Sequence, residues 1–157
     1  TAVLVGGETT TELVDLRRRY GLEAAVEFIP HLDREGLRDR LRSLDLFVVP
    51  SHQEGLCIAA LEAMACGCPV VSTRCGGPEE FVIDDETGYL VDFDAGQLAG
   101  AIDRVLANRE RRDRLAVGAR VLIERAYSPQ LAKEVFWRAF EQTFADSKKT
   151  KGNCRSP

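Results

Sequence analysis

FVVPSHQEGLCIAALEAMACGCPVVST (residues 47–73) carries the strongest fold signal in this chain of 157 residues. Short apolar runs at residues 45–50 and 70–73 are rich in β-branched side chains, as is typical of strands buried on both faces. Between them, the Ala-rich segment 56–66 predicts a helix, which the following Gly-Cys-Pro sequence ends. A strand, a helix and a strand in this order predict a parallel pair of strands joined by a right-handed crossover.

The rest of the chain continues this alternation. Strands are expected at residues 2–6, 25–29 and 87–92, and helices at residues 9–20, 33–44, 78–85, 95–107, 109–126 and 129–145. Because residues 2–6 are one apolar run, we expect this strand to be buried on both faces. The predicted fold class is α/β, a Rossmann-like parallel sheet flanked by helices. We expect one domain over residues 1–145, without repeat or internal linker, and a disordered tail at residues 146–157.

Composition and charge exclude several classes of protein. The chain is 45% hydrophobic and 29% charged, as in ordinary globular proteins. A net charge of -4 gives no reason to expect nucleic acid or anionic lipid as a partner. No apolar run approaches the roughly 20 residues that a membrane helix needs, and the chain opens on a strand-like run rather than a secretory signal. These features predict a cytoplasmic protein.

The cysteines do not form a metal or disulfide pattern. Their count, five, is odd and their spacing irregular, which favours reduced thiols. Cys66, Cys68 and Cys75 are conceivable ligands, but C-x-C is not a zinc-knuckle pair, and neither His31 nor His52 stands at ligand spacing. We therefore expect small buried side chains here and no metal site.

The predicted topology restricts where a ligand can bind. Parallel sheets bind ligands at the carboxyl ends of their strands, often at helix N-termini. The junctions at this edge are GGETT (6–10), PHLD (30–33), PSHQEGL (50–56) and TRCGGPEE (73–80). The glycine pair of the last junction suits either close approach of a ligand or an ordinary turn. The opposite junctions are expected to be structural.

The junction before the helix at 56–66 resembles an anion site. Gly55 leaves room for close backbone approach, and the amides of Leu56, Cys57 and Ile58 begin the helix unpaired. Free amides together with the helix dipole suit a phosphate or a diphosphate.

Two carboxylates flank this site. Glu54 lies just before the helix, and Glu62 lies about a turn and a half inside it, with a side chain that leans back towards the N-terminus. Carboxylates repel phosphate but accept hydrogen bonds from sugar hydroxyls, so the pair could bracket the diphosphate of a nucleotide sugar. On spacing alone the pair is a weak signal, and the simpler interpretation is that Glu54 caps the helix and Glu62 is an exposed helix residue.

FVVPSHQEGLCIAALEAMACGCPVVSTRCGGPEEFVIDDETGYLV (residues 47–91) resembles the C-terminal, donor-binding domain of retaining family 4 glycosyltransferases, which have the GT-B fold. The family pattern runs P-S-x-x-E-G-[FL]-G-x-x-x-x-E-A-M-A-x-G-x-P-V-[VI], followed by G-G, an acid and T-G-x-L-V. The resemblance covers about residues 1–145, and the ordered set of motifs is specific.

The resemblance implies roles for the candidate residues. Glu54 is expected to contact hydroxyls of the transferred sugar as the catalytic residue, and the amides of Gly55, Leu56, Cys57 and Ile58 to hold the diphosphate. Glu62 is expected to hold the ribose. The base is expected near Ile29, at residues 29–32, and Gly6 lies in the first loop of the site. Glu80 matches the acid that follows the glycine pair.

The implied chemistry is sugar transfer in carbohydrate biosynthesis, with retention at the anomeric carbon. The donor substrate is a nucleoside-diphosphate sugar, and no metal or other cofactor is implied.

Three positions depart from the family pattern. Cys57 replaces the usual glycine, so we expect a thiol to crowd the phosphate. Pro30 also stands where glycine is usual, and the first loop has Gly6, Gly7 and Glu8 where the family has G-x-G.

The start on a strand-like run suggests a fragment of a longer polypeptide. The resemblance implies that the first strand-helix unit and an N-terminal acceptor domain are missing, and with them the Arg and Lys that neutralise the diphosphate. A glycan, lipid or small-molecule acceptor, and any peripheral membrane association, are expected only through that missing half. We expect this chain alone to bind its donor weakly and to transfer nothing, because catalysis in such enzymes requires two domains to close.

Other interpretations stay open. A nucleotide-sugar epimerase shares the two-domain architecture, and a non-catalytic binding or scaffolding module could derive from such a domain. An α-glucan phosphorylase is disfavoured, because none of the lysines, Lys133, Lys148, Lys149 and Lys151, lies at a strand-end loop. The base, the sugar, the acceptor and the oligomeric state are not predicted.

Overall fold

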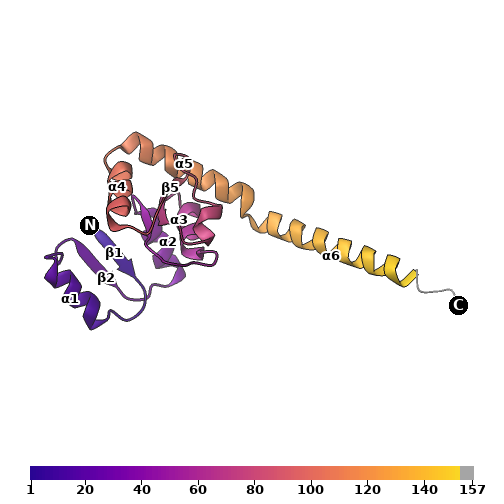
Figure 1. The fold of residues 1–157 in the computed structure, drawn as a ribbon, viewed down its shortest axis with the longest axis horizontal. Coiled ribbons are helices and arrows are strands. Elements are labelled where there is room, and N and C mark those ends of the chain that lie inside the picture. The colour runs from indigo at the N-terminus through magenta and orange to yellow at the C-terminus, as the bar shows by residue number, and fades with distance from the viewer. Residues whose placement is uncertain (153–157) are drawn as a thin grey trace. The chain divides into compact units, whose positions relative to one another are not determined.

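A computed structural model of the chain describes the backbone of residues 1–152 and the side chains of residues 1–144. The elements, in chain order (Figure 1), are β1 (Ala2–Val5), α1 (Thr11–Arg19), β2 (Val26–Ile29), α2 (Arg34–Arg42), β3 (Phe47–Val49), α3 (Ile58–Ala65), β4 (Val70–Thr73), the 3-10 helix η1 (Gly77–Glu80), β5 (Gly88–Val91), α4 (Ala95–Leu106), α5 (Arg109–Ala126) and α6 (Pro129–Gly152). The predicted α/β class with parallel strands is confirmed. The helix predicted at residues 78–85 is only the short η1.

The last helix extends past its predicted end at residue 145. Residues 146–151 contain neither Gly nor Pro, so nothing in the backbone stops α6 before Gly152. The predicted tail is therefore helical over its first part, and residues 153–157 lie outside the described residues.

The strands form two parallel sheets. β1 pairs with β2, and β3, β4 and β5 form a second sheet in that order. The chain divides accordingly into two compact units, residues 1–43 and residues 44–157. The sequence predicted one sheet; the alternation of elements indicates parallel strands but does not specify which strands become neighbours.

In the first unit, the sheet is only partly covered. Leu4 and Val5 of β1 are 44% and 39% exposed, so the prediction that this strand is buried on both faces is wrong. A two-stranded sheet offers too few neighbouring side chains to cover both faces. Arg17 of α1 packs over the ring of Phe28, 5.0 Å from its centroid, and donates a hydrogen bond of 3.3 Å to the carbonyl of Val26.

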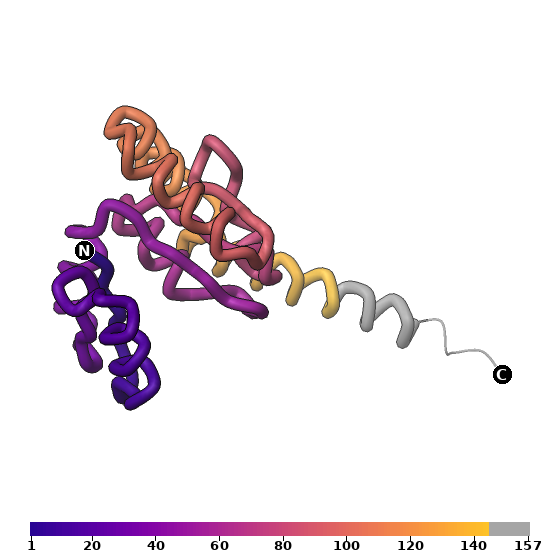
Figure 2. The backbone as a smooth tube through the Cα atoms, turned by 60° about the vertical axis from the view of Figure 1, so that its left-hand side comes forward, coloured from indigo at the N-terminus to yellow at the C-terminus, as the bar shows by residue number. Residues whose placement is uncertain are grey.

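In the second unit, the central strand β4 is buried throughout. Val70 belongs to a core cluster with Ala60 and Met64 of α3, and Val71 to a second cluster with Val105 of α4. Because neighbouring residues of a strand point to opposite faces, α3 and α4 cover opposite faces of the sheet. The helix α5 lies beside α4 (Figure 2) and contributes to both clusters.

Five helices begin with a side-chain cap. A polar oxygen accepts a hydrogen bond from an amide of the first turn in each case: Thr10 for α1, Asp33 for α2, Asp94 for α4, Asn108 for α5 and Ser128 for α6. Among the α-helices of residues 1–152, α3 is the exception, because Cys57 at its N-cap makes no such bond.

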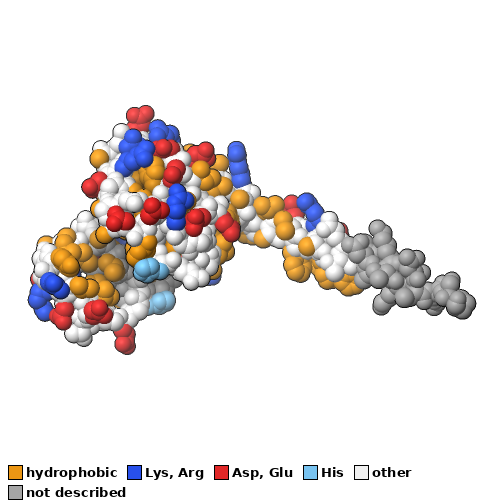
Figure 3. All heavy atoms as spheres, in the orientation of Figure 1, with side chains coloured by type: hydrophobic (Ala, Val, Ile, Leu, Met, Phe, Trp, Pro, Cys, Tyr) orange, Lys and Arg blue, Asp and Glu red, His pale blue; other side chains and the backbone are white. Residues whose placement is uncertain are grey.

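The helix α6 displays aromatic side chains. Figure 3 shows hydrophobic atoms along its surface, where the exposed apolar residues are Val135, Phe136, Trp137, Phe140 and Phe144. No helix in the described part of the chain is both long and apolar enough to cross a membrane.

Candidate functional site

The loops that follow β3 and β4 lie together at the carboxyl edge of the sheet, because the two strands pair in parallel. The amide of Glu54 donates a hydrogen bond of 2.7 Å to the carbonyl of Cys75, and the amide of Gly77 donates one of 3.2 Å to the carbonyl of Glu54. Glu54 is thus held by backbone bonds to the loop after β4, on both sides of its peptide.

The glycine pair of that loop permits this contact. A Cβ on Gly77 would lie 1.7 Å from the carbonyl oxygen of Gly55, and one on Gly76 would lie 2.8 Å from that of Glu54. Gly76 also has a φ of 103°, which side chains disfavour. From the sequence, the two glycines could serve either a ligand or an ordinary turn. In the structure, they let their loop approach the backbone of residues 54–56 closely.

Backbone amides are free at the start of α3. Within residues 1–152, no hydrogen bond uses the N–H groups of Gly55, Leu56, Cys57, Ile58 or Ala59. Leu56 and Ile58 are 46% and 63% exposed, so the loop is open to solvent. Consecutive free amides at a helix N-terminus are preorganised donors for an anion.

The side chain of Cys57 is partly buried against the core. Cys57 has a left-handed backbone, φ 55° and ψ 63°, and its side chain packs against the core cluster that contains Met64 and Cys75. Burial raises the pKa of the Cys57 thiol, an effect that the nearby Ala60 amide partly opposes. The side chain thus packs against the core cluster but stays partly exposed, and the amide is free. That the thiol crowds a phosphate stays a prediction.

The two flanking carboxylates both retain free acceptor oxygens. Glu54 is half-buried, and its Oε1 accepts a hydrogen bond of 2.7 Å from the hydroxyl of Ser51. Glu62 is exposed on α3, and its carboxylate makes no hydrogen bond or ion pair with the described residues. That the two acids bracket one ligand stays a prediction.

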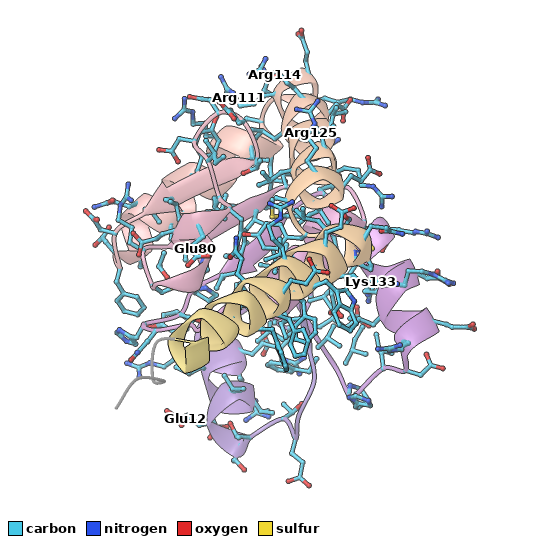
Figure 4. All side chains as sticks on the ribbon, turned by 90° about the vertical axis from the view of Figure 1, so that its right-hand side faces the viewer. Glu12, Glu80, Arg111, Arg114, Arg125 and Lys133 are labelled. Atoms are coloured by element: carbon cyan, nitrogen blue, oxygen red, sulfur yellow. The ribbon has the colours of Figure 1, made fainter. Side chains whose placement is uncertain are left out.

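Glu80 is exposed at the end of η1 (Figure 4), and its charge adds to the effect of burial in raising the pKa of Tyr127. Its neighbour Glu79 accepts a hydrogen bond of 3.1 Å from the amide of Gly76 and so stabilises the glycine turn.

Gly6 and Ile29 belong to the first unit. The structure brings them together, because the amide of Gly6 donates a hydrogen bond of 3.1 Å to the carbonyl of Ile29 at the carboxyl ends of β1 and β2. Their part in one site with Glu54 stays a prediction.

Three side chains at the carboxyl edge were not singled out from the sequence. His52 follows β3, Arg74 follows β4 and Phe93 follows β5. The sequence feature that could have identified them is their position just after three predicted strands. These strands are neighbours in the sheet. Among the described residues, no group of three or more His, Cys, Asp or Glu could hold a metal ion.

A parallel α/β fold with free helix amides at the carboxyl edge of its sheet is an arrangement that many anion- and nucleotide-binding proteins share. The family described as glycosyl transferases group 1 matches residues 1–121, and this chain belongs to it. The sequence-based recognition of a group 1 GT-B glycosyltransferase is confirmed.

Individual relatives agree with this family. The chain is 39% identical over 129 residues to a D-inositol 3-phosphate glycosyltransferase of Xylanimonas cellulosilytica, covering 78% of this chain and 31% of that protein. It is similar in fold to sucrose-phosphate synthase from Thermosynechococcus elongatus, with a TM-score of 0.84, 32% identity, and coverage of 92% of this chain and 38% of that one. Anabaena HepE, solved in complex with UDP-glucose, has a TM-score of 0.82 and 26% identity over 90% of this chain and 41% of its own. The chain thus spans about a third of the curated relative it matches.

Proposed function

We propose that this chain is the donor-binding part of a retaining glycosyltransferase, which moves a sugar from a nucleoside-diphosphate sugar to an acceptor hydroxyl. The observation that carries the proposal is the row of free amides from Gly55 to Ala59, beside a Glu54 that the next loop holds in place. The amides would hold the diphosphate, and the free oxygens of Glu54 would accept hydrogen bonds from the transferred sugar.

The remaining assignments extend this pocket. Glu62 would hold the ribose, and the backbone at Ile29 and Gly6 would contact the nucleoside. The known complex of the relative HepE with UDP-glucose supports a nucleotide sugar as the ligand. The proposal requires no metal and no further cofactor. The cytoplasmic localisation stays a prediction from composition.

Two alternatives stand beside this proposal. A non-catalytic module would account for the departures from the family pattern at Cys57 and Glu8, but the amide of Cys57 makes no hydrogen bond within residues 1–152 and can still serve an anion. A nucleotide-sugar epimerase would use the same donor pocket and differs in the second substrate.

Calorimetry with UDP-, GDP- and ADP-sugars tests the proposal. We expect one of them to bind, and Glu54→Gln and Glu62→Gln each to weaken binding about tenfold, because a charge-assisted hydrogen bond is worth about 1.5–3 kcal/mol. Glu110→Gln, a change of an exposed glutamate on α5, is the matched control and should leave the affinity unchanged.

Failure of all three nucleotide sugars to bind would favour the non-catalytic module. We further propose that the 157-residue chain by itself is inactive. If this chain alone transferred sugar to any acceptor, the proposed inactivity would be wrong. The proposal that the chain binds a nucleotide sugar would still stand.

A further inference from the structure

An exposed aromatic pair lies at the carboxyl edge of the second sheet. The rings of His52 and Phe93 are stacked, with centroids 3.5 Å apart and planes inclined by 26°. His52 comes from the loop after β3 and Phe93 from the loop after β5, so the pair spans the end of β4 between them. Phe93 is 53% exposed, which leaves part of its ring open to a ligand.

The loops that carry this pair are rigid. The amide of Arg74 donates a hydrogen bond of 2.8 Å to the carbonyl of Val91, and that of Asp94 donates one of 2.7 Å to the carbonyl of Asp92. Asp94 in turn caps α4, and the buried Thr73 hydroxyl donates to the carbonyls of Val49 and Ser51. These bonds fix the backbone on both sides of Phe93, and its ring stacks on His52, which lowers the entropy cost of binding a ligand.

Polar side chains beside the ring are loosely paired. Arg74, whose side chain is 50% exposed, makes long ion pairs of 3.8 Å with both Glu79 and Asp92. Exposed pairs of this length contribute little to stability, so the guanidinium and the carboxylates can exchange partners for a ligand at small cost.

The charges near Phe93 select the class of ligand. Arg74 is paired with two carboxylates, Glu79 and Asp92, so this part of the edge, away from the free amides at the start of α3, supplies no excess positive charge for a phosphate. Hydroxyl groups suit it, because they donate to carboxylates and accept from a guanidinium. An aromatic face beside such groups suits the apolar C–H face of a pyranose ring.

We propose that His52 and Phe93, with Arg74 and Asp92, form a platform that binds a neutral sugar ring. This inference rests on the proposed function and deepens it, because it places a ring contact at the β5 side of the edge at which Glu54 lies. The ring belongs either to the donor or to the acceptor, and the experiment distinguishes these two sources.

The test uses the full chain and Phe93→Ala, with Phe93→Tyr as the variant that keeps a ring. Phe136→Ala is the matched control, because Phe136 is also an exposed phenylalanine, 62% exposed on α6. The affinities for UDP and UDP-glucose are measured by calorimetry. Methyl α-glucopyranoside is titrated with and without UDP, and the amide NMR signals of His52 and Phe93 are followed.

If the ring belongs to the donor, Phe93→Ala weakens UDP-glucose about threefold to tenfold and leaves UDP unchanged. If the ring belongs to the acceptor, Phe93→Ala binds UDP and UDP-glucose like the parent chain. The glucoside then no longer shifts the amide NMR signals near residue 52 in this variant. Phe93→Tyr and Phe136→Ala should match the parent chain in either case.

A Phe93→Ala chain that equals the parent in all these titrations overturns the platform, as does an equal loss for UDP and UDP-glucose. If neither UDP nor UDP-glucose binds the parent chain, UDP-glucose is not its donor, and the glucoside titration alone decides the platform. Absence of any shift at residues 52 and 93 with every ligand overturns it.

Discussion

At the scale of single residues, two features create the candidate site. Cys57 adopts a left-handed backbone, its side chain packs against the core cluster, and its amide is free. Gly77 lets the loop after β4 touch the loop before α3. Both are backbone effects that determine where Glu54 and the free amides lie.

Gly77→Ala should disrupt the site. Its Cβ would lie 1.7 Å from the carbonyl oxygen of Gly55, so the loops must separate. We expect a loss of about 2–4 kcal/mol in the free energy of unfolding, typical of a severe backbone conflict, together with loss of nucleotide-sugar binding. Urea unfolding and calorimetry check both effects.

Gly55→Ala is the matched control, because a Cβ there meets nothing within 4 Å. It should change the stability by less than about 1 kcal/mol. Equal stabilities of the two variants would contradict the described loop contact.

Because of Cys68, the free energy of unfolding should depend on pH in the alkaline range. Burial is the main cause that raises the pKa of its thiol to about 12. The unfolded thiol ionises near its ordinary value of about 8.5, whereas the folded thiol stays protonated. The folded chain then binds more protons than the unfolded one, so stability is lost as the pH rises through the window from about 9 to 12, by up to about 1.4 kcal/mol per pH unit from this group.

Urea unfolding of the parent chain and of Cys68→Ala at several pH values from 8 to 11 checks this prediction. The substitution lowers stability at every pH because it leaves a cavity, but its stability should decline less steeply with pH. Parallel declines in the two proteins would refute the role of Cys68.

At the scale of elements, packing overrides helix propensity. The helix α4 contains Gly96 in its first turn and Gly100 in its interior, and α5 contains Gly118; glycine normally weakens a helix interior. A Cβ on Gly118 of α5 would lie 2.0 Å from the carbonyl oxygen of Glu86, whereas one on Gly100 of α4 meets nothing within 4 Å. Gly118 is therefore required by close packing, whereas no packing contact requires a glycine at position 100. The sequence around each position does not reveal this difference.

Alanine substitutions at these two glycines should act in opposite directions. Gly100→Ala should stabilise the chain by about 0.5–1 kcal/mol, because alanine has the higher helix propensity. Gly118→Ala should destabilise it by about 2 kcal/mol or more, because α5 must move away from the turn before β5. Thermal unfolding of both variants checks the pair, and a stabilised Gly118→Ala would show that α5 does not pack against residue 86.

At the scale of the whole molecule, burial is unequal between the two units. The buried core residues Val49, Met64, Val70, Phe81 and Leu115 all lie in residues 44–157, with others of that unit, whereas in residues 1–43 only Leu41 is buried among the described hydrophobic side chains. Hydrophobic burial is the main stabilising term, so the second unit should be the more stable part of the chain.

Native-state hydrogen exchange should show this difference. Amides of β4 are expected to exchange only through global unfolding, and amides of β1 and β2 through smaller openings with a lower free energy. Mass spectrometry on peptides from each strand measures the protection. Equal protection of β1 and β4 would mean that the two units unfold together.

Sequence patterns alone determined the α/β class, the order of the elements and the family, because the periodicity of apolar residues and the spacing of the E-G-L and G-G motifs are local properties. They also marked Glu54, Gly55 and Glu62 as candidates. Only the tertiary structure decided that the strands form two sheets, that the side chain of Cys57 packs against the core cluster, that Gly77 packs on Gly55, and that His52 stacks on Phe93. These features depend on which strands become neighbours and on where side chains meet across large sequence separations, and no local pattern encodes that.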